Sequence, residues 1–257
     1  MIGGYMIPIR DVNPSLTYPI ITFLLIAASA AVFFGIQSDQ SSEFEFAYRQ
    51  AAIACELSTG EALSIAEIEG QRCDEADGNP LFPEKSLGLS VIVSMFLHGG
   101  LLHLAGNMWS VWIFGNNVED AFGTIGYLLM YLASGVVATL GFVALNPDTT
   151  IPLVGASGAI AGVMGAYLVL YPRARVVSVF PILFFLPIAL PAAVFLAIWF
   201  VGQFALVGLA TGIAWEAHVA GFLFGAAVAG IGRRPLLSRI ERLRRAKNLV
   251  GSGSKAQ

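Results

Sequence analysis

The sequence Gly155-Ala156-Ser157-Gly158 lies at the start of an apolar run over residues 153–171. A second stretch, Ala217-His218-Val219-Ala220-Gly221, lies inside another apolar run, over residues 214–232. Each run approaches the roughly 20 residues that a helix needs to cross a membrane. Polar side chains at membrane depth usually face a partner or a water-filled cavity, so Ser157 and His218 are candidate functional residues.

The composition is that of a membrane protein. Of 257 residues, 56% are hydrophobic and 12% are charged, whereas soluble domains carry about 25% charged residues. We predict a single-domain, all-α, polytopic bundle over residues 1–257. Six runs predict its membrane-spanning helices: 16–36, 99–118, 121–145, 153–171, 189–209 and 214–232. The apolar stretch 176–188 contains Pro181 and Pro187 and is expected to be a broken or interfacial lead-in to the fifth helix.

The two signs of charge are segregated along the chain, and this predicts its orientation. Lys and Arg gather in the cytoplasmic loops of membrane proteins. One side carries eleven of them, eight in the tail 233–257, and the other carries only Arg49, Arg72 and Lys85. Both termini are therefore expected in the cytoplasm, with residues 37–97 as a large extracytoplasmic loop between the first two helices. We expect a multi-pass protein of a bacterial cell membrane.

The outer loop and the tail are the main polar segments. The loop is too long to be structureless and is predicted to pack as a small cap, with a turn at Asp77-Gly78-Asn79-Pro80. It contains both cysteines, Cys55 and Cys73. An extracytoplasmic pair favours a disulfide, and two unpaired thiols are the alternative. The tail 233–257 is predicted to form a basic helix at the membrane interface, in contact with anionic lipid.

Ser157 and His218 each stand at the start of a stripe of small residues. The residues that share these helix faces, or lie beside them, are Gly158, Ala161, Gly162, Gly165, Gly221, Gly225 and Ala229. Small stripes let helix backbones approach closely in lipid. Packing the two stripes together would bring the serine within hydrogen-bond distance of a base that can activate it. The alternatives are plain helix packing and a hydroxyl bonded to its own helix.

A third motif begins the second predicted helix, where residues 98–107 read HGGLLHLAGN. His103 and Asn107 are four residues apart and so lie on one helix face. Two neutral donors on one face can hold a developing oxyanion, which acyl-transfer chemistry requires. A lone buried histidine is more often a structural group. Three histidines, an asparagine and a glycine-flanked serine in three predicted spans instead favour a catalytic site.

These motifs together resemble the rhomboid family of intramembrane serine proteases, over about residues 86–232 and the first span. Residues 98–107, 155–158 and 217–225 match three of the family's motifs, and Gly115-Asn116-Asn117-Val118-Glu119 resembles the end of its second helix. The resemblance implies that Ser157 is the nucleophile and His218 the general base, with no acidic third member. It also implies an oxyanion hole made of His103, Asn107 and the Ser157 backbone N–H. The residues with implied structural roles near the site are His98, Gly155, Gly158, Gly221, Gly225 and Glu119.

The chain departs from some family members in two places. Ala161 stands where some members place an aromatic residue against the catalytic histidine, so either His218 is less firmly oriented in this chain or another side chain supports it. The outer loop also lacks a Trp-Arg pair. Glu216 is two residues from His218, which puts it on another helix face and disfavours it as a third catalytic residue.

The resemblance implies a serine endopeptidase that cleaves transmembrane segments of other proteins within the lipid bilayer. Substrate is expected to enter between the fifth and second helices, past a gate of Phe195, Trp199 and Phe200, for which plain packing is the alternative. No cofactor or nucleic-acid partner is predicted. No metal site is predicted either, since the histidines lack carboxylate or thiolate ligands at metal-site spacing. No oligomeric state is assigned. The rival functions are a rhomboid-like protein that binds spans without cleaving them and a small transporter, which would more often show inverted repeats.

Overall fold

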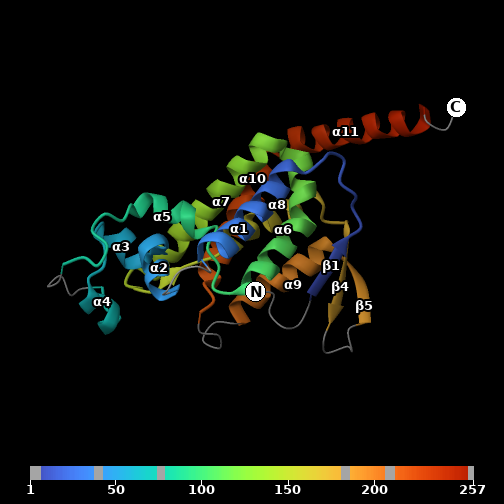
Figure 1. The fold of residues 1–257 in the computed structure, drawn as a ribbon. Coiled ribbons are helices and arrows are strands. Elements are labelled where there is room, and N and C mark those ends of the chain that lie inside the picture. The colour runs from blue at the N-terminus through green and yellow to red at the C-terminus, as the bar shows by residue number, and fades with distance from the viewer. Residues whose placement is uncertain (1–6, 38–42, 74–78, 181–185, 206–211, 254–257) are drawn as a thin grey trace.

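The protein is a bundle of apolar helices with a cap of short helices at one end and a basic helix at the other (Figure 1). The computed structural model describes residues 7–37, 43–73, 79–180, 186–205 and 212–253. The bundle helices are α1 (Ile20–Val32), α6 (Leu101–Phe122), α7 (Thr124–Leu145), α8 (Ser157–Leu170), α9 (Ala192–Ala205) and α10 (Trp215–Ile231). They coincide with the six apolar runs to within a few residues, although the predicted end of the fifth, 206–209, lies outside the described residues.

Two of these helices are by themselves long and apolar enough to cross a membrane. They are α1 together with its π-helical extension η1 (Phe33–Gln37), and α7. A third span arises if α10 and the following helix are counted as one span bent by 75°. Helices α8 and α9 are apolar but shorter. The total of six spans therefore stays a prediction.

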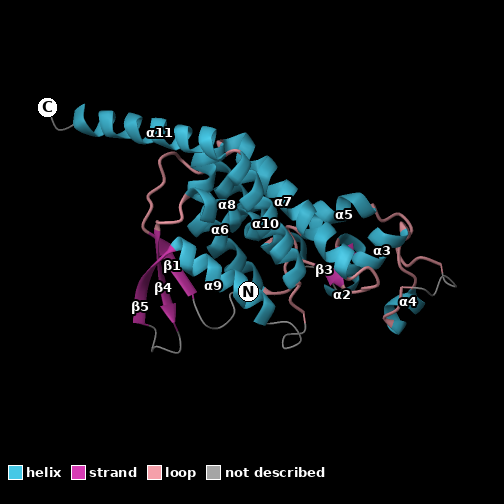
Figure 2. Cartoon of the chain, turned by 180° about the vertical axis from the view of Figure 1, so that it is seen from behind, coloured by secondary structure: helices cyan, strands magenta, loops and turns pink. Residues whose placement is uncertain are grey.

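Helix α8 lies at the centre of the bundle, packed against α6, α7 and α10 (Figure 2). The small stripes predicted on α8 and α10 face each other. A Cβ added to Gly221 would overlap the carbonyl oxygen of Gly158, and one added to Gly225 would overlap that of Gly162. The backbones are thus close enough that only glycine fits at these positions, as small-residue helix packing in membranes requires.

This packing gives a matched pair of substitutions on α10. Gly225→Ala should destabilise the fold by about 1–3 kcal/mol, because overpacking forces two backbones apart. Gly230→Ala, near the end of the same helix, adds a Cβ with nothing within 4 Å and should be neutral or stabilising. Thermal unfolding of the two variants in detergent measures the difference. Equal melting temperatures would show that α8 and α10 are not packed in this way.

A three-stranded antiparallel sheet lies beside the bundle, with strands β1 (Ile7–Asp11), β4 (Arg175–Phe180) and β5 (Leu186–Pro191) in the order β1-β4-β5. The stretch 176–188, expected as a broken or interfacial lead-in to the fifth helix, instead lies in strands β4 and β5 where it is described, and the all-α class omits this sheet. Strand β4 alternates, with Val176 and Ser178 fully buried, and is rich in β-branched residues.

Both prolines of the described part of β5 lie on an edge strand, where a missing N–H is tolerated. Pro187, one of the two prolines that argued for a broken helix, is therefore compatible with a strand. Residues 181–185, which include Pro181, lie outside the described residues.

The start of α1 is held by carboxylates from the end of α6. Glu119 accepts hydrogen bonds from the backbone N–H groups of Ile21 at 2.9 Å and Thr22 at 3.0 Å. Asp120 accepts from the N–H groups of Leu16 at 2.6 Å and Thr17 at 2.8 Å. A helix start leaves its first N–H groups without partners, and a carboxylate satisfies them and complements the helix dipole. Glu119 thus links the end of α6 to the start of α1.

The tail forms the predicted helix, α11 (Arg233–Gly253), directly after α10. Its Ile240 is buried against the bundle, the Arg239 Nε donates to the Asp120 carbonyl oxygen at 3.0 Å, and the Lys247 Nζ donates to the Ser15 carbonyl oxygen at 2.7 Å. Other basic residues of this helix are exposed, namely Arg233, Arg234, Arg242, Arg244 and Arg245. Contact of this exposed basic face with lipid stays a prediction, and Lys255 lies outside the described residues.

The outer loop folds into the cap, apart from residues 38–42 and 74–78, which lie outside the described residues and include Asp77 and Gly78. Its elements are α2 (Glu43–Gln50), β2 (Ala52–Ile53), α3 (Ala54–Thr59), α4 (Ile65–Gly70) and α5 (Leu87–Ser94). Strand β2 pairs with β3 (Pro152–Leu153), in the segment that leads to Ser157. The cap is therefore tied to the chain that positions the serine.

Two links hold the cap together around a small apolar cluster. Cys55 and Cys73 form a disulfide with a Cα–Cα distance of 5.6 Å. The Lys85 Nζ lies 2.5 Å from the Glu56 Oε2, and both side chains are buried. Burial raises the pKa of the Glu56 carboxyl and lowers that of the Lys85 ammonium, while their mutual contact opposes both shifts. Replacing only one member of such a buried pair would strongly destabilise the fold, because the other charge would be left buried without a partner.

The disulfide carries a stability prediction. Replacing Cys55 and Cys73 together by alanine should cost about 3 kcal/mol, from the loop entropy that the bond removes from the unfolded chain. Chemical denaturation of the purified variant measures this cost, with the reduced and oxidised parent as controls. We expect the variant to unfold more easily while its activity in the folded state changes little. Identical stability of reduced and oxidised parent protein would contradict the prediction.

Candidate active site

Ser157 is placed by a turn that requires glycine. Helix α8 begins at Ser157, and Gly155 just before it has a φ of +124°, a region that side-chain-bearing residues rarely adopt. A Cβ on Gly155 would also lie 2.8 Å from two atoms of the His103 ring. The turn therefore serves two purposes, because it starts α8 at the serine and brings the backbone directly against α6.

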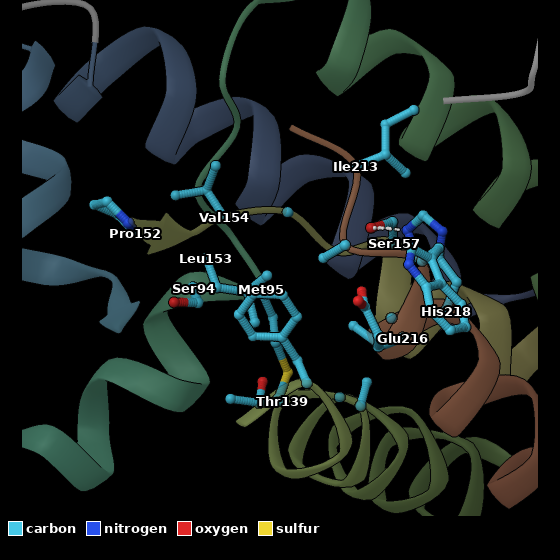
Figure 3. A pocket seen from close by; sticks show the side chains of 18 of the residues that line it. Ser94, Met95, Thr139, Pro152, Leu153, Val154, Ser157, Ile213, Glu216 and His218 are labelled. Carbon is cyan, nitrogen blue, oxygen red and sulfur yellow. Dashed lines mark hydrogen bonds between the residues drawn. The ribbon is translucent and has the colours of Figure 1, made fainter. Parts of the chain in front are cut away.

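His218 lies in the first turns of α10, opposite Ser157. Its Nε2 is 2.8 Å from the Ser157 Oγ, across a separation of 61 residues, and its side chain is buried (Figure 3). The contact forms because the small faces of α8 and α10 meet. The structure thus brings together the two residues that the sequence singled out, in the geometry of a hydroxyl paired with a base.

The other ring nitrogen of His218 contacts a residue that the sequence analysis missed. The Nδ1 lies 2.7 Å from the Oε1 of Gln203, on α9, and Gln203 is 3% exposed. The Trp199 ring, also on α9, lies with its centroid 6.0 Å from that of His218. Gln203 and Trp199 thus contact His218, as the second of the two alternatives for Ala161 predicts. The sequence did carry a signal for Gln203, since an amide side chain within an apolar span usually faces a polar partner.

His103 and Asn107 lie over the same turn. The Gly99 backbone N–H donates to the His103 Nδ1 at 3.3 Å, so the Nε2 of a neutral ring carries the hydrogen. The Asn107 Nδ2 is buried and has no hydrogen-bond partner in the described parts of the chain. It borders a cavity of about 20 Å³ that Ser157 and His218 also line. A buried donor without a partner is unusual, and here it is available to a ligand oxygen.

His98 lies behind His103. Its backbone exchanges two hydrogen bonds of 2.9 Å with the Gln37 side chain, and its Nδ1 lies 3.2 Å from the Phe96 carbonyl oxygen. The His98 and His103 rings meet edge to face with centroids 5.3 Å apart. These contacts fix the position of His98, and its structural role stays a prediction.

The three candidate gate residues lie in different surroundings. Phe195 is 1% exposed and packs in the core against Phe114. Trp199 lies beside His218, and Phe200 packs on Phe222 with centroids 4.8 Å apart. Packing therefore accounts for Phe195 and Phe200. A gating role stays a prediction, and Trp199 is the residue best placed for it.

A pocket of about 500 Å³ leads to Ser157 from the side of the cap. It is bounded by the end of α5, one face of α7, the segment before Ser157 and the first residues of α10. Figure 3 shows Ser157 and His218 together at one side, with the carboxylate of Glu216 facing the space beside them. Among the described residues, no contact joins Glu216 to His218. Ser157 and His218 both line this pocket.

Comparison with known proteins places this site in a family. The model of the Rhomboid domain matches residues 88–235, more than half of the chain. The chain is 46% identical over 78 residues to RHOMBOID-like protein 6, mitochondrial, of Arabidopsis thaliana, which covers 30% of this chain and 25% of that protein. It is 38% identical over 78 residues to Rhomboid protease GluP of Bacillus subtilis, which covers 30% and 15%.

A longer match is to Presenilin-associated rhomboid-like protein A, mitochondrial, of Danio rerio, at 30% identity over 168 residues, covering 62% of this chain and 41% of that protein. The chain thus spans less than half the length of each of these three relatives. The domain match covers α6 to α10, the helices that supply Ser157, His218, His103 and Asn107. Together with its apolar helices, this match shows that the chain is an integral membrane protein that belongs to the rhomboid family.

Proposed function

We propose that this protein is an intramembrane serine endopeptidase that cleaves transmembrane segments of other proteins. The observation that carries the proposal is the 2.8 Å contact between the Ser157 Oγ and the His218 Nε2. It is supported by the partnerless Asn107 amide beside it. A hydroxyl paired with a base, next to a free donor, is the arrangement that acyl transfer needs.

Acylation would run as follows. The Ser157 Oγ attacks the scissile carbonyl carbon while its proton passes to the His218 Nε2. The carbonyl oxygen becomes an oxyanion, which the His103 Nε2–H, the Asn107 Nδ2–H and the Ser157 backbone N–H stabilise. The tetrahedral intermediate collapses, the C–N bond breaks, and His218 returns the proton to the leaving amine. The product is an ester between Ser157 and the new carboxyl end of the substrate.

Deacylation repeats these steps with water. Water reaches the ester through the pocket of about 500 Å³, His218 takes its proton, and the hydroxide attacks the ester carbon. Collapse of the second intermediate returns the proton to the Ser157 oxygen and frees the carboxylate. A neutral imidazole is thus regenerated, and the site is ready for another substrate.

The proposed substrate is a membrane span that unwinds locally. Carbonyl groups within a helix are already hydrogen-bonded, so a peptide must leave the helical state before Ser157 can attack it. We propose that it enters between α9 and α6, past Trp199. Six spans with both termini in the cytoplasm would place the pocket on the outer side, since α11 and the cap lie at opposite ends of the bundle (Figures 1 and 2).

Covalent labelling tests this proposal. A fluorophosphonate should label the detergent-purified protein, and peptide mapping should locate the label on Ser157. Ser157→Ala provides the control for labelling elsewhere. A rhomboid-like protein that only binds spans would instead retain a membrane-segment ligand without labelling or cleavage. Failure of the intact, folded protein both to react and to cleave any span in liposomes would reject the protease assignment.

A further inference from the structure

We propose that Gln203 is a positioning residue that holds His218 in the tautomer able to accept the Ser157 proton. This inference rests on the proposed function and adds a third member to its catalytic machinery. Gln203 is buried, and it is the only residue of α9 with an amide, hydroxyl or charged side chain. A polar group in such a segment calls for a partner, and both ends of this amide have one.

The orientation of the Gln203 amide follows from its two contacts. The Nε2 donates to the Trp199 carbonyl oxygen at 3.1 Å. A carbonyl oxygen only accepts, so the NH₂ end of the amide must be the end that faces Trp199. The Oε1 therefore faces the His218 Nδ1, at 2.7 Å. Neither end is free to flip, because exchange of O and N would set two acceptors against each other at Trp199.

This orientation fixes the hydrogen on His218. An amide oxygen also only accepts, so the Nδ1 must carry the hydrogen of the neutral ring. The Nε2 is then left with its lone pair, directed at the Ser157 Oγ 2.8 Å away. In the other tautomer the Nε2 would carry the hydrogen and could not receive the serine proton. The Trp199 carbonyl thus sets, through Gln203 and His218, which atom is the base.

In the part of the chain that the structure describes, no carboxylate takes this place, since the His218 Nδ1 contacts the Gln203 Oε1. A neutral amide orients the ring without adding a charge. The hydrogen-bonded series has a single direction from Ser157 to Trp199, and such buried, fully satisfied series hold their members rigidly. The effect of Gln203 is therefore expected in kcat, where the base acts, and less in KM.

Two substitutions of Gln203 and one control test this role in liposome-reconstituted protein. Gln203→Met keeps a similar volume but removes the amide acceptor, and should lower kcat about 10- to 100-fold with little change in KM. Gln203→Glu keeps an acceptor for the His218 Nδ1–H but loses the NH₂ that donates to the Trp199 carbonyl oxygen, so it should restore part of this loss. Its negative charge favours the protonated imidazole, so the acid limb of the kcat/KM profile should move to higher pH. The control is Val201→Ala, at an exposed position of the same helix.

The readouts separate positioning from simple packing. A packing role would lower the melting temperature of Gln203→Met and leave kcat in Gln203→Glu no higher than in Gln203→Met, because packing does not depend on a hydrogen-bond acceptor. Full kcat in Gln203→Met, or no recovery of kcat in a folded Gln203→Glu, would overturn the inference. If Gln203→Met does not fold, the Gln203→Glu profile decides. Failure of the parent protein to react with fluorophosphonate would instead reject the proposed function itself.

A different observation carries a second inference, on substrate class, which also rests on the proposed function. Among the described residues that line the pocket, Glu216 is the only Asp, Glu, Lys or Arg. It is half-buried, and no described residue donates a hydrogen bond to its carboxylate or forms an ion pair with it. The adjacent segment 206–211 carries no cationic residue either. We infer that the pocket favours substrates with Lys or Arg close to the scissile bond.

The reason is the cost of covering the carboxylate. A peptide in the pocket displaces water from Glu216, and a cationic side chain offsets that loss whereas an acidic one is repelled. Wild-type protein should therefore cleave a substrate with Lys near the scissile bond about tenfold faster, in kcat/KM, than its Glu counterpart, which corresponds to one modest charge interaction. The series scans one Lys, Gln or Glu through the positions flanking that bond.

Charge exchange provides the control. Glu216→Gln should bring the ratio of Lys to Glu substrates close to one, and Glu216→Lys should invert it; each ratio is taken within one protein, so a general change in rate cancels. Equal cleavage of the whole series by the wild-type protein would overturn the inference and leave the protease assignment intact, because cleavage itself would have been observed. A preference that persists in Glu216→Lys would assign it to another residue.

Discussion

Ser157→Ala and His218→Ala should each abolish cleavage of a membrane substrate, lowering kcat by on the order of 10⁴- to 10⁶-fold. The Ser157 Oγ and the His218 Nε2 are 2.8 Å apart and act in one proton transfer, so removing either removes the activated nucleophile. Residues that act as a unit are not additive. The double variant should therefore be no slower than either single one, which is a stronger test than loss of activity alone.

Single-turnover cleavage in liposomes measures this effect, and thermal unfolding is the control for folding. Ser157→Ala removes one hydroxyl at a helix start and leaves the contact between Gln203 and His218 in place, so the fold should persist. Substantial activity in purified Ser157→Ala, or losses in the double variant equal to the product of the single losses, would contradict a shared role.

Much of the bundle is predictable from the sequence because its signals are local. Apolar length locates the bundle helices, and the glycine-flanked serine and the small stripes indicate which faces meet. Helix α8 begins at Ser157 as the motif suggests, and Gly221 and Gly225 lie against its backbone. The pairing of Ser157 with His218 then follows from packing two stripes whose first members are these residues.

The missed features depend on contacts between distant segments. Strand β4 pairs with β1, which lies more than 160 residues earlier in the sequence. Apolar periodicity over such a short run does not by itself distinguish a strand from a helix. Gln203 faces His218 because of the way α9 packs against α10, which its own sequence does not encode. Asp120 likewise acts through the segment before α1, about a hundred residues away.

The expected effect of Asn107→Ala combines a loss of rate with no loss of stability. Its Nδ2 is buried without a partner in the described chain, so the free protein bears the cost of a desolvated donor, on the order of 1–3 kcal/mol. That donor is satisfied when an oxyanion forms beside Ser157. Removing one such donor lowers kcat by about 10²- to 10³-fold in acyl-transfer enzymes, and we expect a loss of about 10²-fold here.

Stability should move the other way. Alanine at position 107 removes a donor that makes no hydrogen bond in the free protein, so the melting temperature should be unchanged or higher, as is common where function requires an unsatisfied group. Ser110→Ala is the matched control on the same helix, because the Ser110 hydroxyl already donates to the Gly106 carbonyl oxygen at 2.9 Å. Measuring kcat, KM and the melting temperature of both variants tests this prediction. A normal kcat with a raised KM in Asn107→Ala would place this amide in substrate binding, since a group that holds the oxyanion acts only once the carbonyl has been attacked.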